Sequence, residues 1–181
     1  SNSDIARQVN ASLLLAEIEI SQAPQAATVA RLESYLEIAR FQGAQPYCVQ
    51  ILLILARAKV ALDDIAPAQT YAREALEMAE RCGLKRQVSI ALRLLADIKR
   101  LQGGFESGSR FAERAAALAR RIEAPLEHAQ ALASLSALIA DTNQQVKYLQ
   151  QALSIFNKLG AEFDVAQTRQ RLLEVSPQEQ G

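Results

Sequence analysis

The chain of 181 residues has few of the residues that build strands, metal sites and disulfide frameworks. It contains no tryptophan, five phenylalanines, four tyrosines, seven glycines and five prolines. That is too little turn and strand material for a β-sandwich or a β-barrel. One histidine and two cysteines cannot supply a structural zinc site or a set of disulfides. We therefore predict no metal and no cofactor.

An excess of charge of one sign and long apolar runs are also missing. The 20 lysines and arginines balance the 20 aspartates and glutamates, so the chain lacks the net positive charge that draws proteins to nucleic acids or anionic membranes. No apolar run approaches the ~18 residues of a membrane span. These absences predict a cytoplasmic protein that binds no nucleic acid directly and no membrane.

The two ends of the chain indicate a fragment of a longer protein. Met78 is the only methionine, and Ser1-Asn2 is interpreted as an expression scar. We predict one domain over residues 3–175 and a disordered polar tail at 176–181.

Helix formers and an internal repeat dominate what the chain does contain. It has 33 alanines and 25 leucines, both strong helix formers. A Leu-Ala or Leu-Ser pair recurs every forty residues, and a glycine or glutamate recurs at the same interval: Leu15-Ala16, Leu55-Ala56, Leu95-Ala96 and Leu135-Ser136; Gly43, Gly83 and Glu123. Such self-similarity over nearly the whole chain is typical of a repeat protein.

Each repeat is predicted to form two helices. In the second repeat, Ile51, Leu52 and Leu55 follow helical spacing, Asp63-Asp64 is predicted to cap the next helix, and Gly83 is predicted to end it. The predicted helices cover residues 4–20, 25–42, 46–62, 66–82, 85–102, 106–122, 126–140, 143–159 and 162–174. A helix pair cannot bury both of its faces alone, so the pairs are expected to stack on one another.

Small residues at fixed places in these helices resemble the tetratricopeptide (TPR) repeat. The matching positions are Leu55, Ala56, Ala68, Ala72 and Ala75 in the second repeat, and Leu95, Ala96, Gly108, Ala112 and Ala115 in the third. The repeat of forty residues is longer than the family's, and its tryptophan, tyrosine and helix-ending proline positions are not filled. The long repeat and the phrase Ala152–Ala161 are similar to superhelical regions of large bacterial signalling proteins, including transcription activators of the maltose-regulator type. The resemblance implies a right-handed α-solenoid of four helix pairs plus a C-terminal helix.

The same resemblance implies a concave groove lined by the first helix of each pair. Its predicted lining is Leu13, Glu17, Gln50, Leu53, Arg57, Ile90, Arg93, Asp97, Arg100 and Gln130. Arg57, Arg93 and Arg100 are expected to converge, because they come from adjacent repeats at comparable helical positions. They would bind an acidic peptide or a small anion, since guanidinium groups form bidentate hydrogen bonds with carboxylates and phosphates. The alternative is a solvated face with internal ion pairs such as Arg93 with Asp97, four residues apart on one helix.

No arrangement of nucleophile and base predicts catalysis. His128 is expected to be a surface or boundary residue, Cys48 and Cys82 to be inert, and Gly103–Arg110 to be a turn without the lysine of a phosphate loop. We therefore predict no enzyme but a module for protein interaction or effector sensing, cut from a bacterial signalling or transcription regulator. The alternative is a scaffold that stands alone and pairs with a second copy through the apolar first helix.

Overall fold

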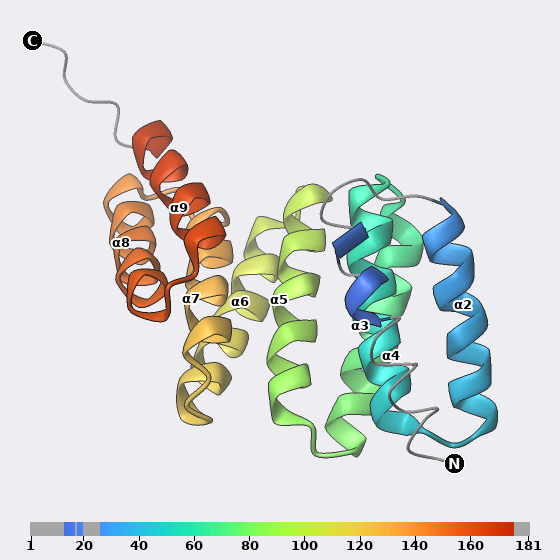
Figure 1. Ribbon diagram of the computed structural model, residues 1–181. Helices are drawn as coiled ribbons and strands as arrows, with labels where there is room; N and C mark the ends of the chain where they lie inside the picture. Colours follow the sequence, from blue (N-terminus) through green and yellow to red (C-terminus); the bar gives the residue numbers. More distant parts are fainter. Residues whose placement is uncertain (1–12, 17, 20–25, 176–181) are drawn as a thin grey trace, which may run out of the picture. The chain divides into compact units, whose positions relative to one another are not determined.

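The structure is a computed structural model that describes residues 13–16, 18, 19 and 26–175 (Figure 1). Residues 13–16, 18 and 19 are helical, and eight complete helices follow. These are α2 (Ala26–Phe41), α3 (Gln45–Ala61), α4 (Ile65–Arg81), α5 (Lys85–Leu101), α6 (Phe105–Arg121), α7 (Pro125–Ser136), α8 (Thr142–Leu159) and α9 (Glu162–Val175). No strand occurs among the described residues. The all-α fold of helix pairs is confirmed, whereas the predicted scar at 1–2, Glu17 and the tail at 176–181 lie outside the described residues.

The helices follow a spacing of twenty residues, half of the predicted repeat. Each of α3, α4, α5 and α6 has 17 residues, and a three-residue turn follows each one. The middle residue of successive turns has a positive φ: Gly43 (67°), Asp63 (58°), Gly83 (69°), Gly103 (75°) and Glu123 (55°). The next residue along donates its N–H to a carbonyl five residues back, as in Ala44 to Ala39 and Ala124 to Ala119, both at 2.9 Å. Each of these helices therefore ends in a Schellman-type turn.

The predicted capping role of Asp63-Asp64 is wrong. Asp63 adopts the left-handed conformation that ends α3. The side chain of Asp64 makes no capping hydrogen bond and instead forms an ion pair with Lys59, with Nζ 2.8 Å from Oδ2. An aspartate cap does occur at α8, where the Gln144 N–H donates to Asp141 Oδ1 at 2.8 Å.

The chain divides into two compact units, residues 1–87 and 88–181. In the first unit, α3 contacts both α2 and α4. The face of α4 that packs inward consists of fully buried alanines, which let the helices approach closely: Ala68, Ala72, Ala75 and Ala79. Tyr71 also links α4 to α2, because its hydroxyl donates to Glu33 Oε1 at 2.8 Å.

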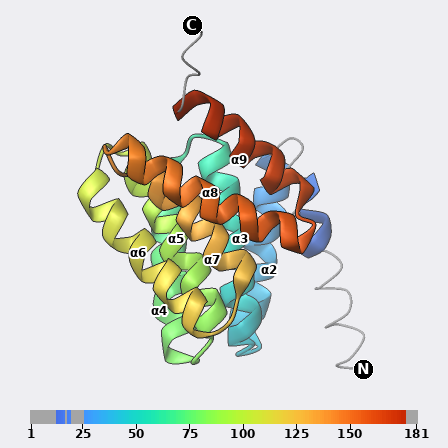
Figure 2. The same ribbon diagram turned by 90° about the vertical axis from the view of Figure 1, so that its left-hand side faces the viewer.

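In the second unit, α7 contacts α6 and α8, and α8 in turn contacts α9 (Figure 2). Its core contains Leu95, Ala96, Leu135 and Ser136, each no more than 3% exposed, as the repeat predicts. Leu55 and Ala56 are equally buried in the first unit. Leu15 is the exception at 58% exposed, because the described residues include no helix pair before it to cover that position.

Helix α7 ends at Ser136, four residues earlier than predicted. The chain after Ser136 changes to the tighter hydrogen bonds of a 3₁₀ turn, in which the N–H of Leu138 donates to the carbonyl three residues back, that of Leu135, at 3.0 Å. Leu138 then turns inward and packs with Ala96, Ala112 and Leu135. The contact favours glycine at position 108, because a Cβ there would lie 2.5 Å from Leu138 Cδ2 and 3.2 Å from the carbonyl oxygen of Ala96, so that Leu138 would have to shift. Gly108 therefore serves helix packing, and Gly103-Gly104 forms the predicted turn.

Candidate functional site

The predicted groove residues of the first unit are partly buried in the core. Leu13 and Leu53 are only 5% and 6% exposed, so their side chains offer almost no open surface. Gln50 is exposed and Arg57 half-buried, both on α3. Arg57 lies in the first unit and Arg93 and Arg100 in the second, so the convergence of these three arginines stays a prediction.

In the second unit, α5 presents Ile90, Arg93, Asp97 and Arg100, all half-buried. Arg93 Nη1 lies 3.2 Å from Asp97 Oδ2, so the predicted internal ion pair is confirmed. The side chains of Arg93 and Asp97 are 18% and 28% exposed. Arg93 is thus already neutralised by a carboxylate, whereas the guanidinium group of Arg100 makes no hydrogen bond or ion pair within the described part of the chain.

The face continues from α5 onto α7 and α9. Gln130 of α7 donates to Asp164 Oδ1 of α9 at 3.4 Å. Arg171 Nη2 donates to Ser136 Oγ at 2.7 Å, while the Ser136 hydroxyl donates to the carbonyl of Ala133 at 2.7 Å. The single hydroxyl proton is used on the carbonyl, so Ser136 is oriented to accept from Arg171.

Arg171 was not among the predicted groove residues. It is the tenth residue of α9, and the tenth residues of α3, α5 and α7 are Ile54, Leu94 and Ser134, each at most 8% exposed. An arginine at a position that is buried in the three earlier helices of this type is a signal in the sequence. It was missed because the interval between α7 and α9 is 37 residues, so the register of forty does not reach α9.

The electrostatics of this face are set by burial and by neighbouring guanidinium groups. Burial lowers the pKa of Arg171, and the charge of Arg100 lowers it further, while Asp97 and Glu174 act in the opposite direction. Arginine nevertheless stays charged at neutral pH because its ordinary pKa is so high. Burial and the charge of Arg100 thus both act against the positive charge of Arg171.

Among the described residues, His128 and Cys48 are two further side chains of chemical interest. His128 is half-buried, and its Nδ1 lies 3.0 Å from the carbonyl oxygen of Ala116, as expected for a boundary residue. It borders an apolar hollow of about 310 Å³ near the turn between α6 and α7. Cys48 is buried, which raises the pKa of its thiol. In the part of the chain that the structure describes, no three metal-binding side chains gather, and no helix has the length and apolarity to cross a membrane.

Solved structures share this fold. The chain superposes on a Signal Transduction ATPase with Numerous Domains from Pyrococcus horikoshii, which carries a tetratricopeptide repeat sensor, with a TM-score of 0.67 and 17% identity over 88% of this chain and 29% of that chain. It superposes on BtubC (BKLC) from P. vanneervenii with a TM-score of 0.64 and 17% identity, over 94% of this chain and 81% of that one. A kinesin light chain of Podosopora anserina with TPR-like repeats gives 0.61 and 16%, over 96% and 89%.

These similarities establish a TPR-like fold of repeated helix pairs. No protein-family model matches the sequence, and no curated protein matches it. The chain spans less than a third of the P. horikoshii ATPase, and its sequence is at most 17% identical to those of the three structures.

Proposed function

We propose that this chain is a non-enzymatic module that binds a protein or peptide partner through one face of its second unit, to which the helices α5, α7 and α9 contribute. The observation that carries the proposal is the row of half-exposed charged side chains on these helices. Arg93, Asp97 and Arg100 lie on α5, and Arg171 lies on α9. Half-exposed arginines suit the rim of a protein interface, because their guanidinium groups form planar, charge-assisted hydrogen bonds.

The partner that fits these side chains is an acidic peptide segment. In the finer form of the proposal, the module senses an effector inside a cytoplasmic bacterial signalling or transcription regulator. The similarity to the repeat sensor of the P. horikoshii ATPase supports this form, although at 17% identity it is a similarity of fold.

Binding of a defined peptide tests the proposal. An amidated peptide of alternating alanine and glutamate should bind the chain, and its counterparts with glutamine or lysine should not. Arg93→Glu combined with Arg100→Glu should abolish binding, because it replaces two cations with anions on the proposed face. Arg93→Glu also replaces a partly buried ion pair with Asp97 by two like charges, so circular dichroism must show that the variant is folded at the temperature of the binding measurement. Arg121→Glu, at the exposed end of α6, is the matched control, and equal loss of binding in that variant would contradict the proposed face.

Self-association is the second candidate, and one observation favours it. Leu14, Leu15 and Ile18 are 62%, 58% and 52% exposed, and these three aliphatic side chains within five residues form an apolar surface that a second copy would cover. Light scattering should then report a dimer that Leu15→Glu converts to a monomer. A wild-type monomer at high concentration would refute this candidate.

A further inference from the structure

The apolar hollow beside His128 in the second unit has the features of a ligand-binding site. It measures about 310 Å³. Its apolar walls come from the end of α6, the turn that follows, the start of α7, and α8: Ala119, Ala124, Pro125 and Ile155. We propose that this hollow binds a small, uncharged aromatic molecule of two fused rings, which donates one hydrogen bond to His128. The inference goes beyond the proposed partner-binding function and does not rest on it.

His128 supplies the hollow with one hydrogen-bond acceptor. Its Nδ1 lies 3.0 Å from the carbonyl oxygen of Ala116, and because a carbonyl only accepts, Nδ1 carries the proton. A neutral imidazole protonated at Nδ1 accepts a hydrogen bond at Nε2, and this imidazole makes no other hydrogen bond among the described residues. Val88 holds the same place forty residues earlier and is half-buried like His128, so the repeat does not require a histidine there.

The size and charge of the hollow define the rest of the ligand. Ligand sites in proteins are mostly apolar and begin at roughly 300 Å³, and an apolar cavity of about 150 Å³ already binds benzene. A hollow of about 310 Å³ therefore has room for two fused rings. The two charged residues that border it, Arg120 and Glu123, are exposed and opposite in sign, so they add no net charge that would select an anion or a cation.

The alanine at position 124 leaves space that a larger residue would occupy. Ala124 donates its N–H to the carbonyl of Ala119 at 2.9 Å. Forty residues earlier, Leu84 donates to the carbonyl of Ala79 at the same distance of 2.9 Å, so the backbone follows the same course in both turns. A leucine is therefore compatible with this turn, and Ala124→Leu offers a way to fill the hollow without a change of backbone.

The test uses indole, because it has two fused rings, one N–H donor and no charge. Indole should cause saturable shifts in the amide NMR signals of Ala119, Ala124 and His128, and little change in those of α2. The analogue 1-methylindole keeps the rings but has no donor, so it should bind about fivefold more weakly, as expected for the loss of one hydrogen bond. Indole-3-carboxylate keeps the donor and adds a negative charge, and it should bind no more tightly than indole.

Two variants separate the acceptor from the space. His128→Phe keeps an aromatic ring but removes the acceptor, so indole and 1-methylindole should bind this variant with equal affinity. Ala124→Leu should weaken the binding of both probes at least tenfold, because the added side chain takes up space in the hollow. Ala117→Leu makes the same change at an exposed position of α6 outside the hollow, and this matched control should bind both probes like the wild type.

Three results would overturn the site: shifts that stay linear up to the solubility of indole, equal affinities of indole and 1-methylindole for the wild type, or wild-type affinity in Ala124→Leu. Tighter binding of indole-3-carboxylate that Arg120→Gln abolishes would indicate an anion site and refute the proposed class of ligand. The comparison of probes on the wild type depends on no variant, and circular dichroism at 222 nm shows whether each variant is folded. Arg93→Glu with Arg100→Glu should leave indole binding unchanged, so this site and the partner-binding face can fail separately.

Discussion

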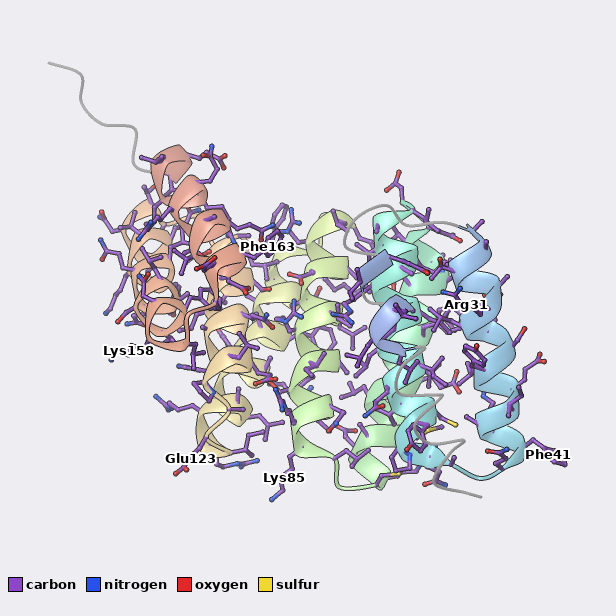
Figure 3. The ribbon with its side chains drawn as sticks, viewed as in Figure 1. Arg31, Phe41, Lys85, Glu123, Lys158 and Phe163 are labelled. Carbon is purple, nitrogen blue, oxygen red and sulfur yellow. The ribbon has the colours of Figure 1, made fainter. Side chains whose placement is uncertain are left out.

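Glu123 holds a conformation that glycine adopts more easily, and Glu123→Gly should therefore stabilise the protein. Its φ is 55°, and its exposed side chain points away from the helices at the turn between α6 and α7 (Figure 3). Gly43 and Gly83 occupy the same place in the two earlier turns between helix pairs, with φ of 67° and 69°. Glutamate is thus the residue that departs from the pattern.

The expected gain is the difference between two opposing effects. A left-handed conformation costs a non-glycine residue about 1–2 kcal/mol. Glycine in turn loses more backbone entropy on folding, which costs about 0.4–1 kcal/mol. Glu123→Gly should therefore raise the free energy of unfolding by about 0.5–1 kcal/mol. The gain at Asp63 should be smaller, because aspartate tolerates this conformation better than glutamate.

The reverse change isolates the same effect. A Cβ added at Gly83 meets no atom within 4 Å, so Gly83→Ala should lower the free energy of unfolding by about 1 kcal/mol through conformation alone. Gly108→Ala is the steric contrast, because its Cβ would lie 2.5 Å from Leu138 Cδ2. Overpacking of that kind costs about 1–3 kcal/mol.

Urea unfolding followed by circular dichroism at 222 nm measures all three variants. The slope of the unfolding free energy with urea should stay the same in Glu123→Gly and Gly83→Ala, because neither changes the surface buried on folding. A neutral or destabilising Glu123→Gly together with a neutral Gly83→Ala would refute the view that left-handed residues end these helices at a conformational cost.

Three further predictions concern the first unit. Ala72→Glu should lower the free energy of unfolding by several kcal/mol, because Ala72 is 0% exposed and the change forces a charge into a close helix contact; chemical denaturation checks this, and a loss within 0.5 kcal/mol would contradict it. Burial and the hydrogen bond to Glu33 raise the pKa of Tyr71 from 10 to about 12. The folded state therefore keeps the phenol proton to a higher pH than the unfolded state does. The resulting contribution to the free energy of unfolding is complete below pH 10 and should be lost between about pH 10 and 12. Stability measured across that window should fall less in Tyr71→Phe, and an equal fall would contradict the assignment. A thiol reagent should label Cys82 well before Cys48, because Cys48 is 2% exposed with a raised thiol pKa; equal labelling rates, followed by mass spectrometry, would be the contrary result.

The repeated helix pairs could be predicted because the helical spacing of apolar residues is a local pattern that recurs every forty residues. Leu55, Ala56, Leu95 and Ala96 lie in the core at no more than 1% exposed, where the spacing of apolar residues placed them. Glycine at 83 marks a helix end in sequence because it adopts a positive φ without strain.

The features that escaped prediction depend on tertiary context. Asp63 ends a helix in the same conformation as glycine, although it was predicted to cap the next helix. Glu123 lies at a turn that the repeat predicts, but glutamate gives no signal of the positive φ found there. The early end of α7 depends on Leu138 packing against Ala96 and Ala112, contacts made between helices rather than within one. Leu15 is exposed although it matches Leu55 in the repeat, because burial depends on which helices lie beside each position.

Arg171 brings the fold and the proposed function together. At the tenth position of α3 and α5, Ile54 and Leu94 are apolar and each 4% exposed, whereas α9 has an arginine there. The arginine at this place gives up apolar burial and acquires one oriented hydrogen bond to Ser136 and the repulsion of Arg100. In most of a protein, local propensity, hydrophobic pattern and core packing favour the same residue at a given position. A residue that departs from the pattern of its repeat and lowers stability is therefore expected at a functional site. Comparison of the repeats therefore identifies Arg171 of α9 as a residue whose type the fold does not explain.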